Sequence, residues 1–261
     1  MDDFIPKKAV DFLLYNTVLI EGKYENGDYS EGTGFFFNYK KEIFIVTAKH
    51  VIENTKDGYI TFNVKHEEHQ KSTNKCRYDF SELWFSNKLD DIDVAVCNIS
   101  NIYKENEWLE QNIKGITIGE WNFLSPQEKY YIQSLEQIFF IGFPVGNIEE
   151  FKDVPLVRMG ITATNILMSK KGRECFIIDA SSFEGSSGSP VFLYDKQLIN
   201  NNSGNPNIVK YVKFLGILTK SLLTEEEKQE GKRNGINNHA NLGLVLNENN
   251  LKNVLYEYFA T

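Results

Sequence analysis

The sequence contains only three cysteines, which limits the covalent chemistry that it can support. Cys76, Cys97 and Cys175 form no CxxC pair, and their number is odd. Widely spaced cysteines in an odd number argue against a disulfide framework, so we expect reduced, structural thiols. Burial is expected above all for Cys97, because it lies inside the apolar run VAVCNI.

Histidines are also scarce, and their spacing argues against a common type of zinc site. Of the four in the chain, His66 and His69 stand close together in HEEH. The zinc-binding pattern HExxH separates its histidines by one residue more, so that both lie on one face of a helix. No third ligand is evident in the sequence. A solvated loop is the better interpretation of HEEH, and we expect neither a metal nor another cofactor.

Long apolar runs and an excess of basic residues are missing as well. No segment approaches the roughly 18–20 apolar residues of a membrane-spanning helix, and the N-terminus has acidic residues where a signal peptide would carry basic ones. The formal net charge of −8 favours a soluble protein and argues against a broad nucleic-acid-binding surface. We therefore expect a cytoplasmic protein that binds neither membranes nor nucleic acids.

What the sequence does contain is a series of short apolar segments of about five to eight residues. Most are rich in β-branched or aromatic residues and are bounded by Gly, Asn or Asp. This pattern favours an all-β fold, either a sandwich or a pair of barrels. The expected strands are 16–22, 32–39, 42–48, 58–64, 93–99, 138–143, 174–179, 189–195, 212–219 and 241–247.

Helical patterns are few, and two segments show them. Residues 125–135 begin with Ser125 as a candidate cap, followed by Pro126 at the first helical position. Residues 247–259 have the spacing of an amphipathic C-terminal helix, with four apolar side chains on one face: Leu251, Val254, Leu255 and Phe259. The expected surface loops are three polar segments: 66–75, a long hairpin loop at 197–207, and 224–241.

The stretch FEGSSGSPVF, residues 183–192, has two opposite interpretations. Its Gly and Ser residues are typical of a flexible linker, but also of a tight turn that presents a nucleophilic serine. Compact strand patterns, CFIIDA and PVFLYD, stand directly on both sides, so a turn fits better than a tether. The strand-to-helix elbow GxSxG is excluded, because its last Gly is missing and a strand pattern follows.

A serine nucleophile needs backbone donors for the oxyanion, and the glycines around Ser187 suit that need. Gly185 permits the backbone path on which the N–H groups of Gly185 and Ser187 converge on an oxyanion. Ser186 and Ser189 are the competing hydroxyls in this stretch. Only Ser187 has a glycine two residues before it and another, Gly188, directly after it.

The serine also needs a base and an orienting carboxylate, and candidates for both lie upstream. His50 follows the pattern of one strand, and Asp93 stands at the head of another. The order His, Asp, Ser is one of the known chain orders of the Ser-His-Asp triad. The alternatives are a hydrogen-bonded core histidine for His50, and Asp90 or Asp91 in place of Asp93.

These motifs together resemble those of the trypsin-like serine peptidases, especially the bacterial branch that includes the HtrA-type proteases. The matching motifs are TAKH around His50, DVAV from Asp93 and GSSGSP around Ser187. DVAV favours Asp93 over its neighbours, because the family's Asp directly precedes an apolar-Ala-apolar pattern. IGFPVG (141–146) and MGITA (159–163) resemble the IGxPxG and GIVSA of that branch. The resemblance spans roughly residues 12 to 260.

The resemblance implies two perpendicular six-stranded antiparallel β-barrels with the triad in the cleft between them. We expect a single peptidase domain, with an N-terminal barrel at about 12–124, a C-terminal barrel at 136–247 and a C-terminal helix at 248–259. No PDZ-like segment is expected after it. The implied activity is that of a serine endopeptidase acting on protein or peptide substrates.

The resemblance also implies substrate-binding residues. Aligning LGILT (215–219) with the matching family strand places Thr219 where a hydroxyl supports the triad Asp. It places Lys220 and Ser221 where an extended substrate pairs its backbone. Ser181, six residues before the nucleophile, would lie at the floor of the S1 pocket. Because Ser181 is neutral, we expect an apolar or aromatic P1 side chain, and His239 is a candidate for reshaping that pocket.

Two positions depart from the digestive enzymes of the family. Ser189 stands where they have a Gly after the Ser-Gly pair, as bacterial relatives often do. Ser186 stands where they have an Asp that pairs with a newly cut N-terminus, so we expect loops or an activating protein partner to order the oxyanion turn instead. A bacterial stress or defence effector would suit such a peptidase. The competing hypothesis is a catalytically silent module of the same fold that binds peptides or serves as a scaffold.

Overall fold

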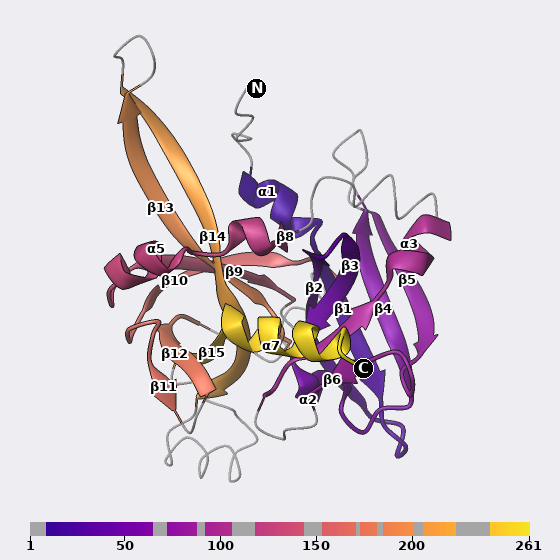
Figure 1. Ribbon diagram of the computed structural model, residues 1–261. Coiled ribbons are helices and arrows are strands. Elements are labelled where there is room, and N and C mark those ends of the chain that lie inside the picture. Colours follow the sequence, from indigo (N-terminus) through magenta and orange to yellow (C-terminus); the bar gives the residue numbers. More distant parts are fainter. Residues whose placement is uncertain are drawn as a thin grey trace.

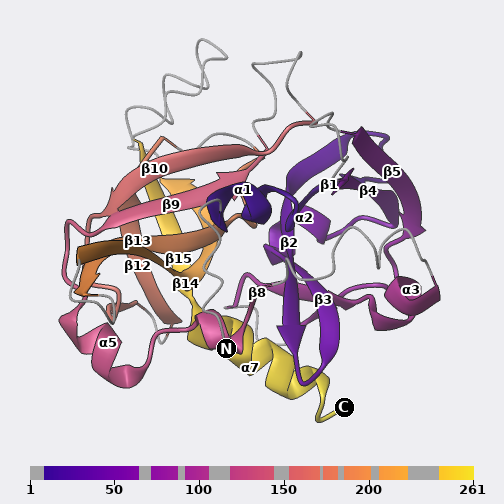
Figure 2. The same cartoon turned by 90° about the horizontal axis from the view of Figure 1, so that it is seen from above.

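The main elements of the protein are two β-sheets and a C-terminal helix. The computed structural model describes residues 9–64, 72–87, 92–105, 118–143, 153–170, 173–181, 185–200, 206–222 and 241–261. The two sheets lie side by side, and the C-terminal helix contacts both of them (Figures 1 and 2). The fold is therefore all-β with a C-terminal helix, as the sequence predicts.

The first sheet has eight strands in the order β5-β4-β1-β2-β3-β7-β6, with β8 paired in parallel to β2. It differs from the expected closed barrel, because no ladder joins β5 to β6 within the described residues. Aromatic rings occupy this end instead: Phe80 packs edge-on against Trp84, with centroids 5.8 Å apart. The strands are β1 (Thr17–Lys23), β2 (Tyr29–Tyr39), β3 (Glu42–Thr47), β4 (Asp57–Val64), β5 (Ser72–Asp79), β6 (Phe85–Ser86), β7 (Ala95–Asn98) and β8 (Ile118–Gly119).

The second sheet has seven strands in the order β10-β9-β13-β14-β15-β12-β11. A further pairing of β10 with β12, at Ile161 opposite Asp179, closes six of them into a barrel. The closed barrel expected for the C-terminal half is thus confirmed. The strands are β9 (Gln137–Gly142), β10 (Leu156–Thr162), β11 (Ser169–Lys170), β12 (Arg173–Asp179), β13 (Pro190–Asn200), β14 (Pro206–Leu222) and β15 (Leu242–Asn247).

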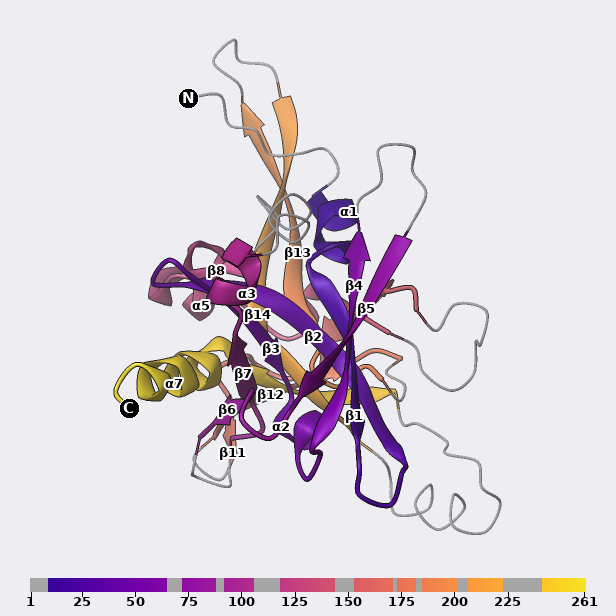
Figure 3. The same ribbon diagram turned by 90° about the vertical axis from the view of Figure 1, so that its right-hand side faces the viewer.

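The apolar patterns locate every expected strand, but the polar patterns overstate the loops. β5 begins at Ser72, inside the expected loop 66–75. Strand β13 continues to Asn200, and its hairpin partner β14 begins at Pro206. Together they form a long ribbon that projects from the barrel (Figures 1 and 3). Ladder hydrogen bonds join backbone groups, so a polar sequence need not end a strand whose partner continues. Residues 65–71, 201–205 and 223–240 lie outside the described residues.

Both predicted helices are present, and the first has the predicted cap. The Ser125 hydroxyl accepts from the N–H of Glu128 at 3.2 Å, and the Glu128 carboxylate accepts from the N–H of Ser125 at 2.7 Å. This reciprocal pair satisfies two N–H groups at the start of the helix. No helix among the described residues is long and apolar enough to cross a membrane. The helices are α1 (Ala9–Leu14), α2 (Lys49–Ile52), α3 (Ser100–Glu105), α5 (Pro126–Tyr131) and α7 (Glu248–Tyr258), with a 3₁₀ turn at Glu120–Asn122.

One aromatic core joins the two sheets and α7. The ring of Phe214 in β14 lies 5.6 Å from that of Phe35 and 6.1 Å from that of Phe37, both in β2. Phe259, expected on the apolar face of the helix, follows the helix end and is 37% exposed. Because the rings of both sheets share one cluster, the sheets cannot separate without exposing it. Three residues of α7 are fully buried in this cluster, as predicted: Leu251, Val254 and Leu255.

The three cysteines are free, as their spacing predicts. Cys97 and Cys175 are buried and Cys76 is half-buried. Burial raises the pKa of the Cys97 thiol to about 12, because the thiolate would lose its hydration there. The Cys97 thiol is therefore protonated at neutral pH and contributes to packing rather than to reactivity.

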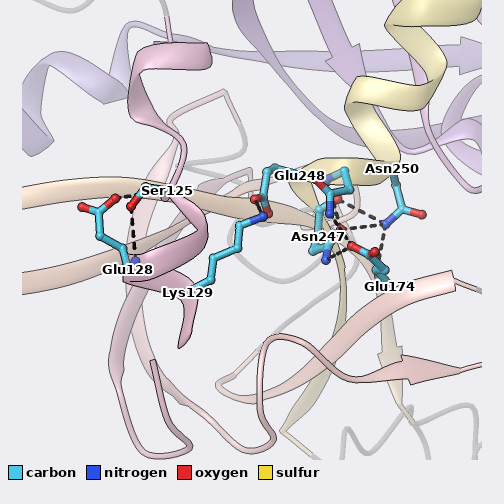
Figure 4. Close-up of polar contacts among 8 residues, drawn as sticks. Ser125, Glu128, Lys129, Glu174, Asn247, Glu248 and Asn250 are labelled. Atoms are coloured by element: carbon cyan, nitrogen blue, oxygen red, sulfur yellow. Dashed lines mark hydrogen bonds and ion pairs between the residues drawn. The ribbon is translucent and has the colours of Figure 1, made fainter. Parts of the chain in front are cut away.

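A polar cluster fixes the start of α7 against α5 and β12 (Figure 4). Lys129 of α5 forms an ion pair with Glu248 at the start of α7, and their side chains are only 13% and 4% exposed. Glu174 of β12 accepts from the Asn247 side-chain amide at 2.7 Å, and its backbone carbonyl accepts from Asn250 at 2.7 Å. These bonds set the position of the helix along the sheets, which apolar packing alone does not define.

Replacing Lys129 tests the buried ion pair. Lys129→Met should lower the free energy of unfolding by about 3 kcal/mol, because it leaves the Glu248 carboxylate buried without its partner. Urea denaturation measures the change. The double variant Lys129→Met/Glu248→Gln should recover most of the loss, since no buried charge remains. A double variant as unstable as the single one would contradict the buried-charge explanation.

The pH dependence of stability tests the contribution of Glu174. Hydrogen bonds from the Asn247 and Asn249 amides lower the pKa of Glu174 from its usual 4.5. Such a group stabilises the fold above its unfolded pKa, and this contribution disappears as the pH falls through the folded pKa. Glu174→Gln should therefore cost up to about 1 kcal/mol at neutral pH, and the cost should shrink as the pH falls through the folded pKa.

Urea denaturation across this pH range measures the difference between Glu174→Gln and the wild type. Glu82→Gln is the matched control, because Glu82 is exposed, and it should change little at either pH. A Glu174→Gln difference that persists undiminished at low pH would rule out the proposed charge effect.

Candidate active site

His50 is held in place by Asp93 through two hydrogen bonds. The backbone N–H of His50 donates to Asp93 Oδ1 at 2.9 Å, and the ring Nδ1 lies 2.8 Å from Oδ2. Because a carboxylate only accepts, Nδ1 is the ring nitrogen that donates, and in a neutral imidazole this leaves the lone pair on Nε2. The sheet explains this arrangement. Thr47 at the end of β3 pairs with Ala95 at the start of β7, so the residues beyond these two ends meet.

Ser187 lies on a tight turn between β12 and β13 that requires two glycines. Gly185 and Gly188 have φ angles of +87° and +90°, which L side chains rarely adopt. A Cβ on Gly188 would lie 1.9 Å from a backbone carbonyl oxygen of the first sheet, so no side chain fits there. Ser186 and Ser189 are 4% and 0% exposed, whereas Ser187 is half-buried. Ser187 is therefore the most accessible of the three candidate hydroxyls.

Thr33 of β2 joins this turn to the first sheet. Its N–H and its hydroxyl donate to the carbonyls of Ser187 and Gly185, each at 2.7 Å. The neighbouring Gly32 lies between the two candidate catalytic segments. A Cβ on Gly32 would lie 3.0 Å from the Ser187 carbonyl oxygen and 2.5 Å from the side chain that follows His50. The segments that carry His50 and Ser187 therefore meet on the two sides of Gly32.

Comparison with protein families identifies the family to which the chain belongs. Residues 32–199 match the model of the trypsin-like peptidase domain, which is more than half of the chain. The protein belongs to the trypsin-like peptidase family. The matched range includes His50, Asp93 and Ser187. No curated protein matches the sequence of this chain.

Two solved proteases have a similar fold. An HtrA-type protease, AlgW, solved with a tripeptide, matches 95% of this chain with a TM-score of 0.55 and 14% identity. The serine endoprotease from Yersinia pestis matches 97% of this chain with a TM-score of 0.50 and 15% identity. The peptidase chain spans 60% of the length of the first protein and 67% of the second. At this identity, the likeness concerns the fold.

The Ser187 hydroxyl of the peptidase is directed toward β14. It donates to the carbonyl of Thr219, with an Oγ–O distance of 3.4 Å. Within the described residues, no hydrogen bond joins it to His50. The N–H groups of Gly185 and Ser187 have no acceptor in the described part of the chain. Two backbone donors next to the serine are thus available for a ligand oxygen.

The hydroxyl of Thr219 does not support Asp93 as the family alignment implies. It donates to the carbonyl of Leu244 at 3.4 Å, and Thr219 is only 2% exposed. The reason is a bulge in β14, where the register with β15 passes from Leu218 to Lys220 and leaves Thr219 without an opposite residue. A bulge redirects the side chain of the extra residue, and a linear alignment does not show it.

Lys220 and Ser221 lie on a stretch of β14 with one ladder partner in the described residues. They pair with Leu244 and Gly243 of β15, whereas the pairing of β14 with β13 ends at Ile217. The other edge of this stretch is where a substrate backbone is expected to pair. This assignment of Lys220 and Ser221 stays a prediction.

Ser181 follows the end of β12 and is bonded on two sides. Its hydroxyl donates to Asn241 Oδ1 at 3.2 Å, and its carbonyl accepts from Arg158 Nη1 at 2.6 Å. Ser181 is exposed, and its assignment to the S1 floor stays a prediction. Five other candidates from the sequence lie outside the described residues: His66, His69, Asp90, Asp91 and His239.

Thr33 is the residue of this site that the sequence patterns miss. It is fully buried, and its hydroxyl donates to Gly185 and accepts from the N–H of Phe143 at 3.0 Å. One hydroxyl thus links β2, the serine turn and the end of β9. The only signal in the sequence is a threonine between two glycines in GTGFFF, and that signal does not identify partners so far along the chain.

A valine at position 33 tests this linking role. Thr33→Val should lower the free energy of unfolding by about 2–3 kcal/mol, because the Gly185 carbonyl and the Phe143 N–H would lose their partner in a buried site. Thr61→Val is the matched control. Thr61 is 2% exposed, and its hydroxyl has no hydrogen-bond partner among the described residues, so the same exchange should be close to neutral. Urea denaturation compares the two variants, and equal losses would contradict the linking role.

Proposed function

We propose that this chain is a serine endopeptidase that hydrolyses peptide bonds in protein substrates with His50, Asp93 and Ser187. The observation that carries the proposal is the double hydrogen bond between Asp93 and His50. It orients the imidazole from both its backbone and its ring, and it leaves Nε2 as a proton acceptor. A structural core histidine needs only hydrogen-bond partners. It would not need a serine between two glycines on a neighbouring turn.

The proposed reaction has two halves, formation of the acyl-enzyme and its hydrolysis, and His50 transfers protons in both. The Ser187 side chain turns from the Thr219 carbonyl toward His50, whose Nε2 takes the hydroxyl proton as Oγ bonds to the substrate carbonyl carbon. The N–H groups of Gly185 and Ser187 stabilise the oxyanion. His50 then protonates the leaving amine as the peptide C–N bond breaks. His50 then deprotonates a water molecule, whose oxygen bonds to the acyl carbonyl carbon. As the ester bond breaks, His50 returns the proton to Ser187 Oγ and the acid product leaves.

We propose further that the peptidase rests in an inactive form and that a protein partner activates it. The Ser187 hydroxyl is bonded to Thr219, which favours a resting state in which the hydroxyl is turned away from His50. The buried Ser186 supplies no carboxylate for an ion pair with a newly cut N-terminus, so a different element must drive activation. A bacterial stress or defence effector in the cytoplasm is the setting that we propose for such a peptidase.

The same observation favours a second candidate function. A serine that stays bonded to Thr219 would leave a catalytically silent module that binds peptides along β14. The two candidates differ in whether the Ser187 oxygen ever becomes nucleophilic. An active-site probe therefore separates them directly.

Labelling with a fluorophosphonate probe tests the proposed nucleophile. The wild type should be labelled, most strongly in lysate from stressed cells, and Ser187→Ala should not be labelled. Ser186→Ala is the control, because it removes the neighbouring hydroxyl and keeps that of Ser187. Casein cleavage should follow labelling. A wild type that neither labels nor cleaves in any lysate would support the silent module instead.

Removing the charge of Asp93 tests the role of the carboxylate. Asp93→Asn should lower kcat by about 10⁴, because the amide can donate to Nδ1 and stabilise the wrong tautomer of His50. Kinetics with a peptide substrate measure the effect. Asp79→Asn is the control, because Asp79 stands at the end of β5 and its carboxylate accepts only from Ser81 in the described residues. A loss below about tenfold for Asp93→Asn would contradict the triad assignment.

A further inference from the structure

Arg158 reaches from β10 to the base of the candidate specificity pocket. Along β10, Val157 and Met159 are 40% and 59% exposed, so Arg158 lies on the opposite face, toward the barrel. Two residues further on the same face is Gly160, where a Cβ would lie 2.5 Å from that of Ala180. The missing side chain at Gly160 lets β10 approach the end of β12. The Arg158 side chain therefore extends directly toward the residue after Ala180.

The guanidinium of Arg158 is bonded at this base. Nη1 donates to the carbonyl of Ser181 at 2.6 Å, and the side chain is half-buried. Burial lowers the pKa of Arg158 from its usual value, because the cation loses part of its hydration. The group is still charged at neutral pH, since an arginine side chain does not lose its proton in that range. A positive charge thus lies at the residue that the family resemblance places at the S1 floor.

Asn241 holds the other side of this floor. Its backbone carbonyl accepts from the N–H of Ala180 at 2.7 Å, and its side-chain oxygen accepts from the Ser181 hydroxyl at 3.2 Å. The only hydroxyl proton of Ser181 is therefore used within the protein. Ser181 therefore offers a substrate no hydroxyl proton, and the charge beside its carbonyl is that of Arg158. The chemistry of the floor is set by a residue distant in sequence from the serine turn.

We infer that Arg158 is a specificity-determining residue that selects substrates with Glu or Asp at P1. The inference rests on the proposed function, because P1 has a meaning only for a peptidase. An acidic side chain pairs with a guanidinium in a partly desolvated site, where the attraction exceeds that of a surface pair. A basic side chain would be repelled, and an apolar one would remove water from the cation and offer no hydrogen bond in return. The apolar or aromatic P1 expected from a neutral Ser181 thus gives way to an acidic one.

Cleavage of matched peptides tests the inference. The peptides differ only at P1, which is Glu, Asp, Gln, Leu or Phe. The wild type should cleave the Glu peptide with a kcat/KM at least about tenfold above that for its uncharged isostere Gln. Equal rates for Glu and Gln, or faster cleavage after Leu or Phe, would overturn the inference.

Variants of two arginines test whether the preference for Glu at P1 depends on Arg158. Arg158→Gln should bring the Glu-to-Gln ratio of kcat/KM close to one. Arg77→Gln is the matched control, because Arg77 is 62% exposed and pairs with Asp57 on the first sheet, and the wild-type ratio should persist in it. Fluorophosphonate labelling of each variant reports separately on the Ser187 turn. A uniform loss of all cleavage and of labelling in Arg158→Gln would overturn the inference and show that Arg158 only holds the turn.

Peptide binding separates this inference from the proposed catalysis. Ser187→Ala cannot cleave, so its affinity for fluorescent Glu and Gln peptides, measured by polarisation, depends on the pocket alone. Tighter binding of the Glu peptide by at least about fivefold would support the acidic preference even if the wild type cleaved nothing, in which case only the proposed activity would fail. Equal binding would overturn the preference whatever the result with the catalytic protein.

Discussion

The structure depends on the hydrogen bonds that Thr33 makes across the two sheets. Its N–H and hydroxyl hold the carbonyls of Ser187 and Gly185, and its hydroxyl also accepts from Phe143. Thr33, Gly185 and Phe143 are buried from water, so each bond lost among them leaves a polar group without a partner. One residue of the first sheet thereby determines where the serine turn of the second sheet lies, and the candidate site exists only where these sheets meet.

Apolar packing and directional bonds have different parts in that meeting. The rings around Phe214 and the buried face of α7 give the two sheets one core, which supplies most of the driving force for their association. Burial of this kind tolerates small shifts of one surface along another, whereas hydrogen bonds do not. The Lys129–Glu248 pair and the bonds of Thr33 therefore set the relative position of the elements that the core holds together.

The strands follow from local patterns, and their ends do not. Apolar segments rich in β-branched and aromatic residues predict ten of the strands, and Ser125 and Pro126 predict the start of α5, because caps involve neighbours in sequence. By contrast, Ser72 and the ends of the β13–β14 ribbon are strand residues in polar sequence. Their conformation comes from ladder bonds to a partner strand, and a single segment carries no record of such a partner.

The sequence by itself determined which residues make up the candidate site: His50, Asp93 and Ser187 in that order, and the glycines that a tight turn around Ser187 requires. Tertiary structure alone decided which groups support them. A bulge in β14 turns the Thr219 hydroxyl away from Asp93, and Arg158 brings a positive charge to the Ser181 carbonyl from another strand. The physical reason is that residue type limits the chemistry that a group can perform. Which partners the group contacts depends on their distance and direction, and these are set only when strands remote in sequence pack together.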